Sequence, residues 1–178
     1  MNTETPLNNV WVAVQTRILH EKSVAEQLCA NEYECFLPLC YKEPFGPEPD
    51  LRVNKRQATV ALFPGYLFCR YKESPNFHIR QASGVIKILC YKGIPVIIPN
   101  NEIESIRKIV ASGFFMKPCQ YLKIGLKVYV CSPGCFHGVE GYLMAVNKNK
   151  CKIVSGISLL GKAVTITVDA VHVRQIIG

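Results

Sequence analysis

Cysteine and histidine are the residues of this chain whose types could support metal or thiol chemistry. The sequence contains nine cysteines and four histidines. Cys131 and Cys135 have the spacing closest to half of a zinc site, but no second pair with similar spacing accompanies them. A catalytic Cys–His pair would be brought together only by the fold, and no local motif marks one. We therefore predict no metal site and no cofactor, and we expect the cysteines to behave as small buried hydrophobic residues.

The motifs that position other catalytic groups are missing as well. The sequence contains no G-x-S-x-G, no H-E-x-x-H, no phosphate-binding P-loop and no G-x-G-x-x-G. Glu140 and Asp169 are the only carboxylates after residue 120, which is too few to suggest a paired acid–base site in that region. The sequence therefore predicts a binding protein and not an enzyme.

Positive charge is concentrated in the last third of the chain. The formal net charge is +8. Residues 1–120 carry 14 Lys and Arg against 11 Asp and Glu, whereas residues 121–178 carry 7 against 2. Lys148, Lys150 and Lys152 alternate through an expected hairpin, where they would suit contact with phosphate groups. The alternative is an ordinary solvated turn.

The first part of the chain alternates between strand and helix patterns, and these elements would position the residues named above. Residues 10–14 are apolar on both faces, which predicts a central strand. Val24 and Leu28 lie four residues apart in an amphipathic segment that should end near Asn31. Further strands are expected at 34–39, 57–63, 66–71, 85–91 and 96–98, a short helix at 74–82, and a proline-rich loop at 43–50. We predict that the strands 57–63 and 66–71 pair antiparallel across Pro64-Gly65.

The clearest predicted helix follows Pro99. Asparagines stand at its start, Glu102 and Glu104 lie in its first turn, and Gly113 lies just past its end. After residue 122 the pattern changes to short strands separated by glycine, which favours a small barrel. These strands are expected at 126–131, 139–146, 151–155, 163–168 and 171–177. The change predicts a first domain at 8–112, a linker at 113–121 and a second domain at 122–178.

No segment predicts a membrane span or a secretory signal. The longest apolar stretches, such as residues 60–63, are far shorter than the roughly 20 residues that a membrane helix requires. The first nine residues contain no Lys or Arg and no apolar core of a signal peptide. We expect a cytoplasmic monomer whose cysteines stay reduced.

Several motifs resemble the NusG family of transcription factors. Residues 11–28, which open Trp-Val-Ala-Val-Gln-Thr-Arg, resemble the first strand and helix of its N-terminal domains. Residues 63–68, Phe-Pro-Gly-Tyr-Leu-Phe, resemble its F-P-G-Y-[LI]-[FL] motif, and residues 132–143 resemble a KOW motif. Residues 158–168 are similar to specialised paralogues, such as RfaH, that act on long bacterial operons. The resemblance implies an α+β N-terminal domain, an antiparallel sheet flanked by helices, and a small all-β SH3-like barrel.

This resemblance implies a transcription elongation factor that promotes processive elongation and antitermination. Its N-terminal domain would bind the clamp helices of the largest RNA polymerase subunit. Its barrel would recruit a small-subunit ribosomal protein or a termination factor, or bind DNA or RNA. The expected polymerase contacts are Phe63, Pro64, Tyr66, Phe68, Ile103 and Ile106. The expected nucleic-acid contacts are Arg17, His20, Lys148, Lys150 and Lys152.

Two alternatives accompany this interpretation. Each apolar contact residue could instead belong to the core, because successive side chains of a strand point to opposite faces. A KOW barrel also fits a ribosome-associated RNA-binding protein. The first 110 residues argue against that class, because such proteins are usually far more basic.

Overall fold

A computed structural model describes residues 9–41, 59–72, 78–113, 118–120 and 125–176. The chain divides into two compact units, Met1–Leu37 with Phe63–Asn100, and Pro38–Leu62 with Asn101–Gly178. We call them unit 1 and unit 2. Both are mixed or mostly β, with few helices, as the sequence predicts. The predicted domain limits at 112 and 122 stay a prediction.

Unit 1 is built around the strand β1 (Val10–Thr16). This strand pairs antiparallel with β5 (Tyr66–Tyr71), β6 (Val85–Ile88) and β9 (Ile97–Ile98). The strand β2 (Cys35–Phe36) adds to the far side of β5, which gives the order β2-β5-β1-β6. Four consecutive residues of β1, Trp11 to Val14, are buried because both faces of the strand are covered. The predicted central strand is confirmed.

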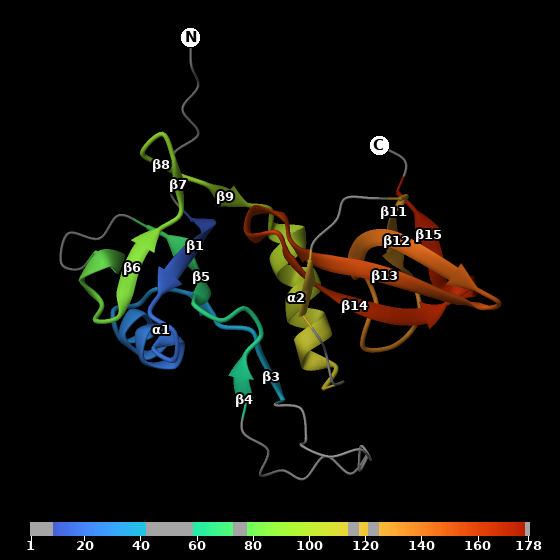
Figure 1. Ribbon diagram of the computed structural model, residues 1–178, viewed down its shortest axis with the longest axis horizontal. Helices are drawn as coiled ribbons and strands as arrows, with labels where there is room; N and C mark the ends of the chain where they lie inside the picture. The colour runs from blue at the N-terminus through green and yellow to red at the C-terminus, as the bar shows by residue number, and fades with distance from the viewer. Residues whose placement is uncertain (1–8, 42–58, 73–77, 114–117, 121–124, 177–178) are drawn as a thin grey trace. The chain divides into compact units, whose positions relative to one another are not determined.

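The helix α1 (Glu21–Ala30) lies beside this sheet (Figure 1). Its Val24 and Leu28 are fully buried and pack with Val12, Val14 and Leu67 of the sheet. Asn31 ends the helix, as the sequence predicts. The remaining elements of unit 1 are short: a 3-10 turn η1 (Ile79–Gln81) and the strands β7 (Cys90–Tyr91) and β8 (Ile94–Pro95).

The predicted pairing of 57–63 with 66–71 is wrong. The strand β4 (Thr59–Ala61) pairs with β3 (Leu39–Tyr41), whereas β5 pairs with β1 and β2. Gly65 does not close a hairpin, because its N–H donates to the Glu21 carboxylate (2.7 Å) and its carbonyl accepts from Thr16 N–H (2.9 Å). The predicted strand 34–39 is two pieces, β2 and β3, separated at Pro38. The predicted loop at 43–50 and the first four residues of the predicted helix at 74–82 lie outside the described residues. The described remainder of that helix, residues 78–82, contains only the three-residue 3-10 turn η1.

The predicted helix after Pro99 is confirmed as α2 (Asn100–Ala111). Ile103, Ile106 and Ile109 form its buried side. Gly113 follows with a φ of +70°, a left-handed conformation that glycine adopts easily at the end of a helix.

Unit 2 contains a six-stranded antiparallel sheet in the order β10-β14-β13-β12-β11-β15. All five predicted strands are present, and β10, which falls in the predicted linker, is additional. The described pairings do not join β10 to β15, so closure into an SH3-like barrel stays a prediction. The strands are β10 (Pro118–Gln120), β11 (Lys127–Val130), β12 (Glu140–Asn147), β13 (Lys150–Ile157), β14 (Lys162–Asp169) and β15 (Val173–Gln175), with 3-10 turns η2 (Ser158–Leu160) and η3 (Ala170–His172).

Within unit 2, polar contacts connect α2 to the C-terminal sheet. The Glu140 backbone N–H donates to Ser105 Oγ (2.9 Å), and the Ser158 backbone N–H donates to Glu102 Oε2 (3.0 Å). Among the residues that the structure describes, no helix is long and apolar enough to cross a membrane.

Candidate functional site

The Phe63 to Phe68 segment forms an aromatic cluster on β5 and the turn before it. Phe63 and Phe68 are both 0 % exposed, and their rings meet edge to face at a centroid distance of 6.2 Å. Phe36 of β2 packs on the other side of Phe68 at 6.1 Å. Phe36, Phe63 and Phe68 thus form one aromatic cluster within unit 1.

Pro64 and Tyr66 remain at the surface beside this cluster. Pro64 is exposed and Tyr66 is partly exposed. The turn that carries them is fixed by Glu21, whose side chain is only 5 % exposed and accepts the Gly65 N–H. A buried carboxylate at the first residue of α1 is favoured by the positive end of the helix dipole. Glu21 is thus a positioning residue for this motif.

The α2 residues predicted to contact polymerase, Ile103 and Ile106, are 0 % exposed. Phe63 and Phe68 are buried as well, and polymerase contact by these four residues stays a prediction. Pro64 and Tyr66 are therefore the predicted apolar contacts that the structure presents at the surface.

Arg17 and His20 flank the loop between β1 and α1. Both are exposed, and between them lie Ile18 and Leu19, which are 68 % and 89 % exposed. Leu19 has a φ of +68°, which a bulky side chain rarely adopts. The loop is held on one side by the Arg17 N–H, which donates to the Gly84 carbonyl (2.8 Å). The result is an exposed apolar pair between two side chains that can carry positive charge.

Close contact with the next loop fixes the position of His20. A Cβ atom on Gly84 would lie 3.0 Å from His20 Cβ and 3.1 Å from a Val24 methyl carbon. Gly84 also has a φ of +102°, so both space and conformation require glycine there. Gly84 therefore holds this loop close to α1.

The three lysines predicted to bind nucleic acid come together at the end of the β12–β13 hairpin. Lys148, Lys150 and Lys152 are all exposed and line one concave surface, which encloses a volume of about 710 Å³. Of the residues that the structure describes, Ala145, Asn147, Asn149 and Thr167 complete the lining, and no carboxylate belongs to it. Lysines that converge in this way can neutralise neighbouring phosphate groups. The fold supplies the proximity that the sequence alternation predicts.

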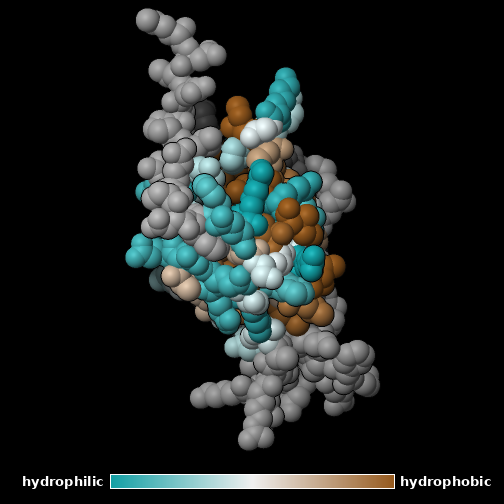
Figure 2. Space-filling view, turned by 90° about the vertical axis from the view of Figure 1, so that its left-hand side faces the viewer, coloured by the Kyte–Doolittle hydropathy of each residue, from teal (hydrophilic) through white to brown (hydrophobic). Residues whose placement is uncertain are grey.

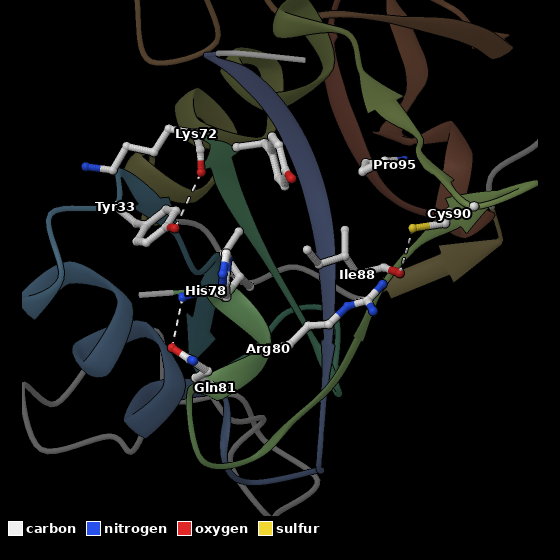
Figure 3. Close-up of a pocket in the computed structure, with 11 residues that line it drawn as sticks. Tyr33, Lys72, His78, Arg80, Gln81, Ile88, Cys90 and Pro95 are labelled. Atoms are coloured by element: carbon white, nitrogen blue, oxygen red, sulfur yellow. Dashed lines mark hydrogen bonds between the residues drawn. The ribbon is translucent and has the colours of Figure 1, made fainter. Parts of the chain in front are cut away.

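A second positively lined pocket lies in unit 1 and was not predicted from the sequence. It has a volume of about 930 Å³, and among the described residues Lys72, His78 and Arg80 contribute to its wall and no carboxylate does. Figure 3 shows Arg80 extending from η1 toward Ile88 and Cys90. Such a wall suits an anionic group. The contributing segments are far apart in sequence, so no local motif could have revealed the pocket.

Lys72 and Tyr33 form a fixed part of this wall. The Tyr33 hydroxyl donates to the Lys72 carbonyl (3.4 Å), and the Lys72 ammonium group lies 5.1 Å from the centre of the Tyr33 ring (Figure 3). The same ammonium group donates to the Glu32 carbonyl. Lys72 is thereby held in one orientation, with its charge beside an aromatic ring.

Exposed apolar side chains also occur along β6 to β9. Ile86, Tyr91, Ile94 and Ile97 are each between 45 % and 69 % exposed. Figure 2 views the molecule from the side on which β6 and α1 lie in Figure 1, and its surface is mostly hydrophilic with apolar residues gathered near one margin.

Among the described residues, no three His, Cys, Asp or Glu side chains are grouped so that they could hold a metal ion.

The chain was compared with known proteins. The family described as transcription termination factor nusG matches residues 9–107, which is 99 of 178 residues. A structure of NusG from Thermotoga maritima, reported for its domain interaction, has a TM-score of 0.51 and 19 % identity, with 94 % of this chain and 97 % of that chain covered. The MjSpt4:Spt5 complex in conformation B has a TM-score of 0.30 and 16 % identity, with 95 % and 98 % covered. No curated protein matches the chain.

The similarity to the Thermotoga structure places the chain in the NusG fold class. The family match covers more than half of the chain, so the chain belongs to the NusG family of transcription elongation factors. Members of this family are not enzymes.

Proposed function

We propose that this protein binds RNA polymerase at the clamp helices of the largest subunit and promotes processive elongation and antitermination. The observation that carries the proposal is the family match over residues 9–107, which includes the whole Phe63 to Phe68 motif. The structure supports it with a rigid turn that presents Pro64 and Tyr66 beside a buried aromatic cluster. Aromatic side chains on a preorganised support are typical anchors of protein interfaces.

The proposed mechanism is a shift between polymerase conformations. A factor that contacts the polymerase on both sides of its cleft favours the closed clamp only to the extent that it binds that state better than the open one. Pausing and termination require the clamp to loosen, so preferential binding to the closed state lowers both.

Basic surfaces of both units add a nucleic-acid contact to the proposal. In unit 1, Arg17 and His20 border an exposed loop, and in unit 2 the three hairpin lysines form one concave surface. We propose that these surfaces contact the DNA or RNA of the elongation complex. Unit 2 would also recruit a small-subunit ribosomal protein or a termination factor.

A pull-down of purified core RNA polymerase by the full chain tests the proposal. We expect the polymerase to be retained without any ribosomal component. Failure to retain polymerase, together with retention of purified ribosomes offered in a separate pull-down, would contradict it and favour a ribosome-associated RNA-binding protein. A variant with Tyr66→Ala supplies the control for binding through the proposed surface.

A further inference from the structure

Three of the nine cysteines lie together in unit 1, on three different elements. Cys29 belongs to the last turn of α1, Cys35 to β2 and Cys69 to β5. Cys35 stands directly opposite Cys69 in the antiparallel pairing of β2 with β5. Among the described strand pairings, no other one sets two cysteines opposite each other. This arrangement is not used by the proposed binding function.

Hydrogen bonding of the two strands determines how close Cys35 and Cys69 come. The Arg70 N–H donates to the Glu34 carbonyl at 2.8 Å, so residues 34 and 70 form a hydrogen-bonded pair. Hydrogen-bonded and non-hydrogen-bonded pairs alternate along an antiparallel ladder, which makes the next pair, Cys35 with Cys69, a non-hydrogen-bonded one. Its Cα atoms are expected at about 4.5 Å, within the range of about 4.4–6.8 Å that a disulfide spans. A bond between these sulfurs therefore needs no movement of the backbone.

Exposure differs across the three cysteines. Cys29 is exposed, Cys35 is partly exposed and Cys69 is fully buried. Cys35 is a neighbour of both other cysteines, because it stands opposite Cys69 in the strand pairing and its thiol interacts with that of Cys29. The cluster thus leads from solvent at Cys29, through Cys35, to the core at Cys69.

We propose that Cys29, Cys35 and Cys69 form a thiol–disulfide exchange site, in which a hydroperoxide oxidises the exposed thiol and the oxidation passes to a Cys35–Cys69 disulfide. The first step transfers the terminal oxygen of the hydroperoxide to Cys29, which becomes a sulfenic acid while the peroxide is reduced to an alcohol or water. Cys35 then attacks the Cys29 sulfur, and a Cys29–Cys35 disulfide forms with release of water. Finally, Cys69 attacks the Cys35 sulfur, and Cys29 leaves as a thiol.

The protonation of the thiols sets the conditions for this chemistry. Burial raises the pKa of Cys29, and the neighbouring Cys35 sulfur raises it further. The hydrogen bond with Cys69, together with burial, raises the pKa of Cys35. Because the thiolate is the reacting form, oxidation should be slow at neutral pH and should accelerate by up to about tenfold per pH unit above it.

Oxidation would fasten the two-residue edge strand β2 to β5, which carries Tyr66. The disulfide would close the chain segment from Cys35 to Cys69. Since a cross-link restricts the unfolded chain more than the folded one, the oxidised protein should have a higher melting temperature than the reduced protein.

Peroxide treatment of the full chain tests the proposal. The reduced protein is incubated with hydrogen peroxide at pH 8, blocked with N-ethylmaleimide, and digested without reductant by a glutamate-specific protease and chymotrypsin. These enzymes can cut after Glu32 or Glu34, between Cys29 and Cys35, and after Phe36, between Cys35 and Cys40. Mass spectrometry then identifies which cysteines are joined. We expect a peptide pair linked through Cys35 and Cys69.

Three variants distinguish the exchange route from direct oxidation. Cys29→Ser should slow formation of the Cys35–Cys69 bond at least fivefold, whereas Cys90→Ser, which removes another exposed cysteine, should not change it. Cys69→Ala should stop the reaction at a Cys29–Cys35 disulfide, and circular dichroism of that variant verifies that it still folds. Absence of any disulfide that includes Cys35 would overturn the proposal. An unchanged rate in Cys29→Ser would overturn it as well.

Discussion

Tyr66 and Phe68 are two residues apart on β5 and would face the same side of an ideal strand, yet only Tyr66 reaches the surface. The reason is that β5 is covered on both faces: Leu67 joins the core beneath α1, and Phe68 packs between Phe63 and Phe36. Alternation along a strand identifies faces, but it does not reveal whether each face is covered. The sequence therefore predicted the aromatic motif, but it could not separate the motif's surface residues from its buried ones.

The Tyr66 side chain offers the first prediction. Tyr66→Ala should weaken binding to core RNA polymerase by about 2 kcal/mol, or roughly 30-fold in Kd, because an exposed aromatic anchor is lost. Fluorescence anisotropy of the labelled full chain measures the change. Phe68→Ala is unsuitable for this purpose, since emptying a buried aromatic site costs about 3–5 kcal/mol of stability.

The matched control for Tyr66→Ala is Tyr91→Ala, because Tyr91 is also a surface tyrosine of unit 1 but lies on β7. Its Kd should stay within twofold of the original. Equal affinities for a folded Tyr66→Ala variant and the original chain would contradict the proposed contact.

At the scale of elements, local sequence patterns predicted which segments are helices or strands well, but they predicted which strands pair with each other poorly. The apolar spacing of Ile103, Ile106 and Ile109 correctly predicted α2, and glycine-separated strands correctly predicted most of the C-terminal sheet. The pairing of β4 was wrong because β3 and β4 are joined by long-range contacts that no local pattern encodes. The strand β10 was missed because its three residues, which begin with Pro118, resemble a linker.

The contact between Glu21 and Gly65 joins α1 to the turn before β5 and gives a stability prediction. Glu21→Ala removes the acceptor of the Gly65 N–H, which should lower the free energy of unfolding by about 1–3 kcal/mol. Glu21→Gln keeps an acceptor oxygen and should lower it less. Urea unfolding of both variants gives the comparison, and equal stability of Glu21→Ala and the original chain would show that the bond has no structural role.

The β12–β13 hairpin carries the prediction for nucleic-acid binding. Replacement of Lys148, Lys150 and Lys152 by glutamine should weaken binding to an oligonucleotide and reduce the slope of log K against log salt by about 2–3. Binding titrations between about 50 and 300 mM salt measure this slope, because salt in this range screens exposed charges increasingly.

A variant that lacks three other exposed positive charges controls for the change in net charge. Lys87→Gln, Lys92→Gln and Arg174→Gln together change the net charge by the same amount outside the lysine surface. Their combined variant should keep a slope close to the original. An unchanged slope in the hairpin variant would mean that the three lysines form an ordinary solvated turn.

At the scale of the whole molecule, the family match rests mainly on the N-terminal part of the chain, whereas much of the excess positive charge lies after residue 120. The proposed functions divide in the same way, with polymerase binding in the first part and nucleic-acid or ribosome contact in the second. The second pocket, in unit 1, crosses this division, because Lys72 and Arg80 in its wall place positive charge on the less basic part. Composition by region could not reveal it, since the fold alone gathers these side chains.

Single-round transcription on a template with defined pauses and a terminator tests the central proposal most directly. The full chain is added to preformed elongation complexes without ribosomes, and the Tyr66→Ala variant is run in parallel. We predict shorter pauses and more read-through at the terminator with the original chain, and a smaller effect at equal concentration with the variant. Longer pauses or increased termination, with the original chain bound to polymerase, would contradict the proposal that it promotes processive elongation.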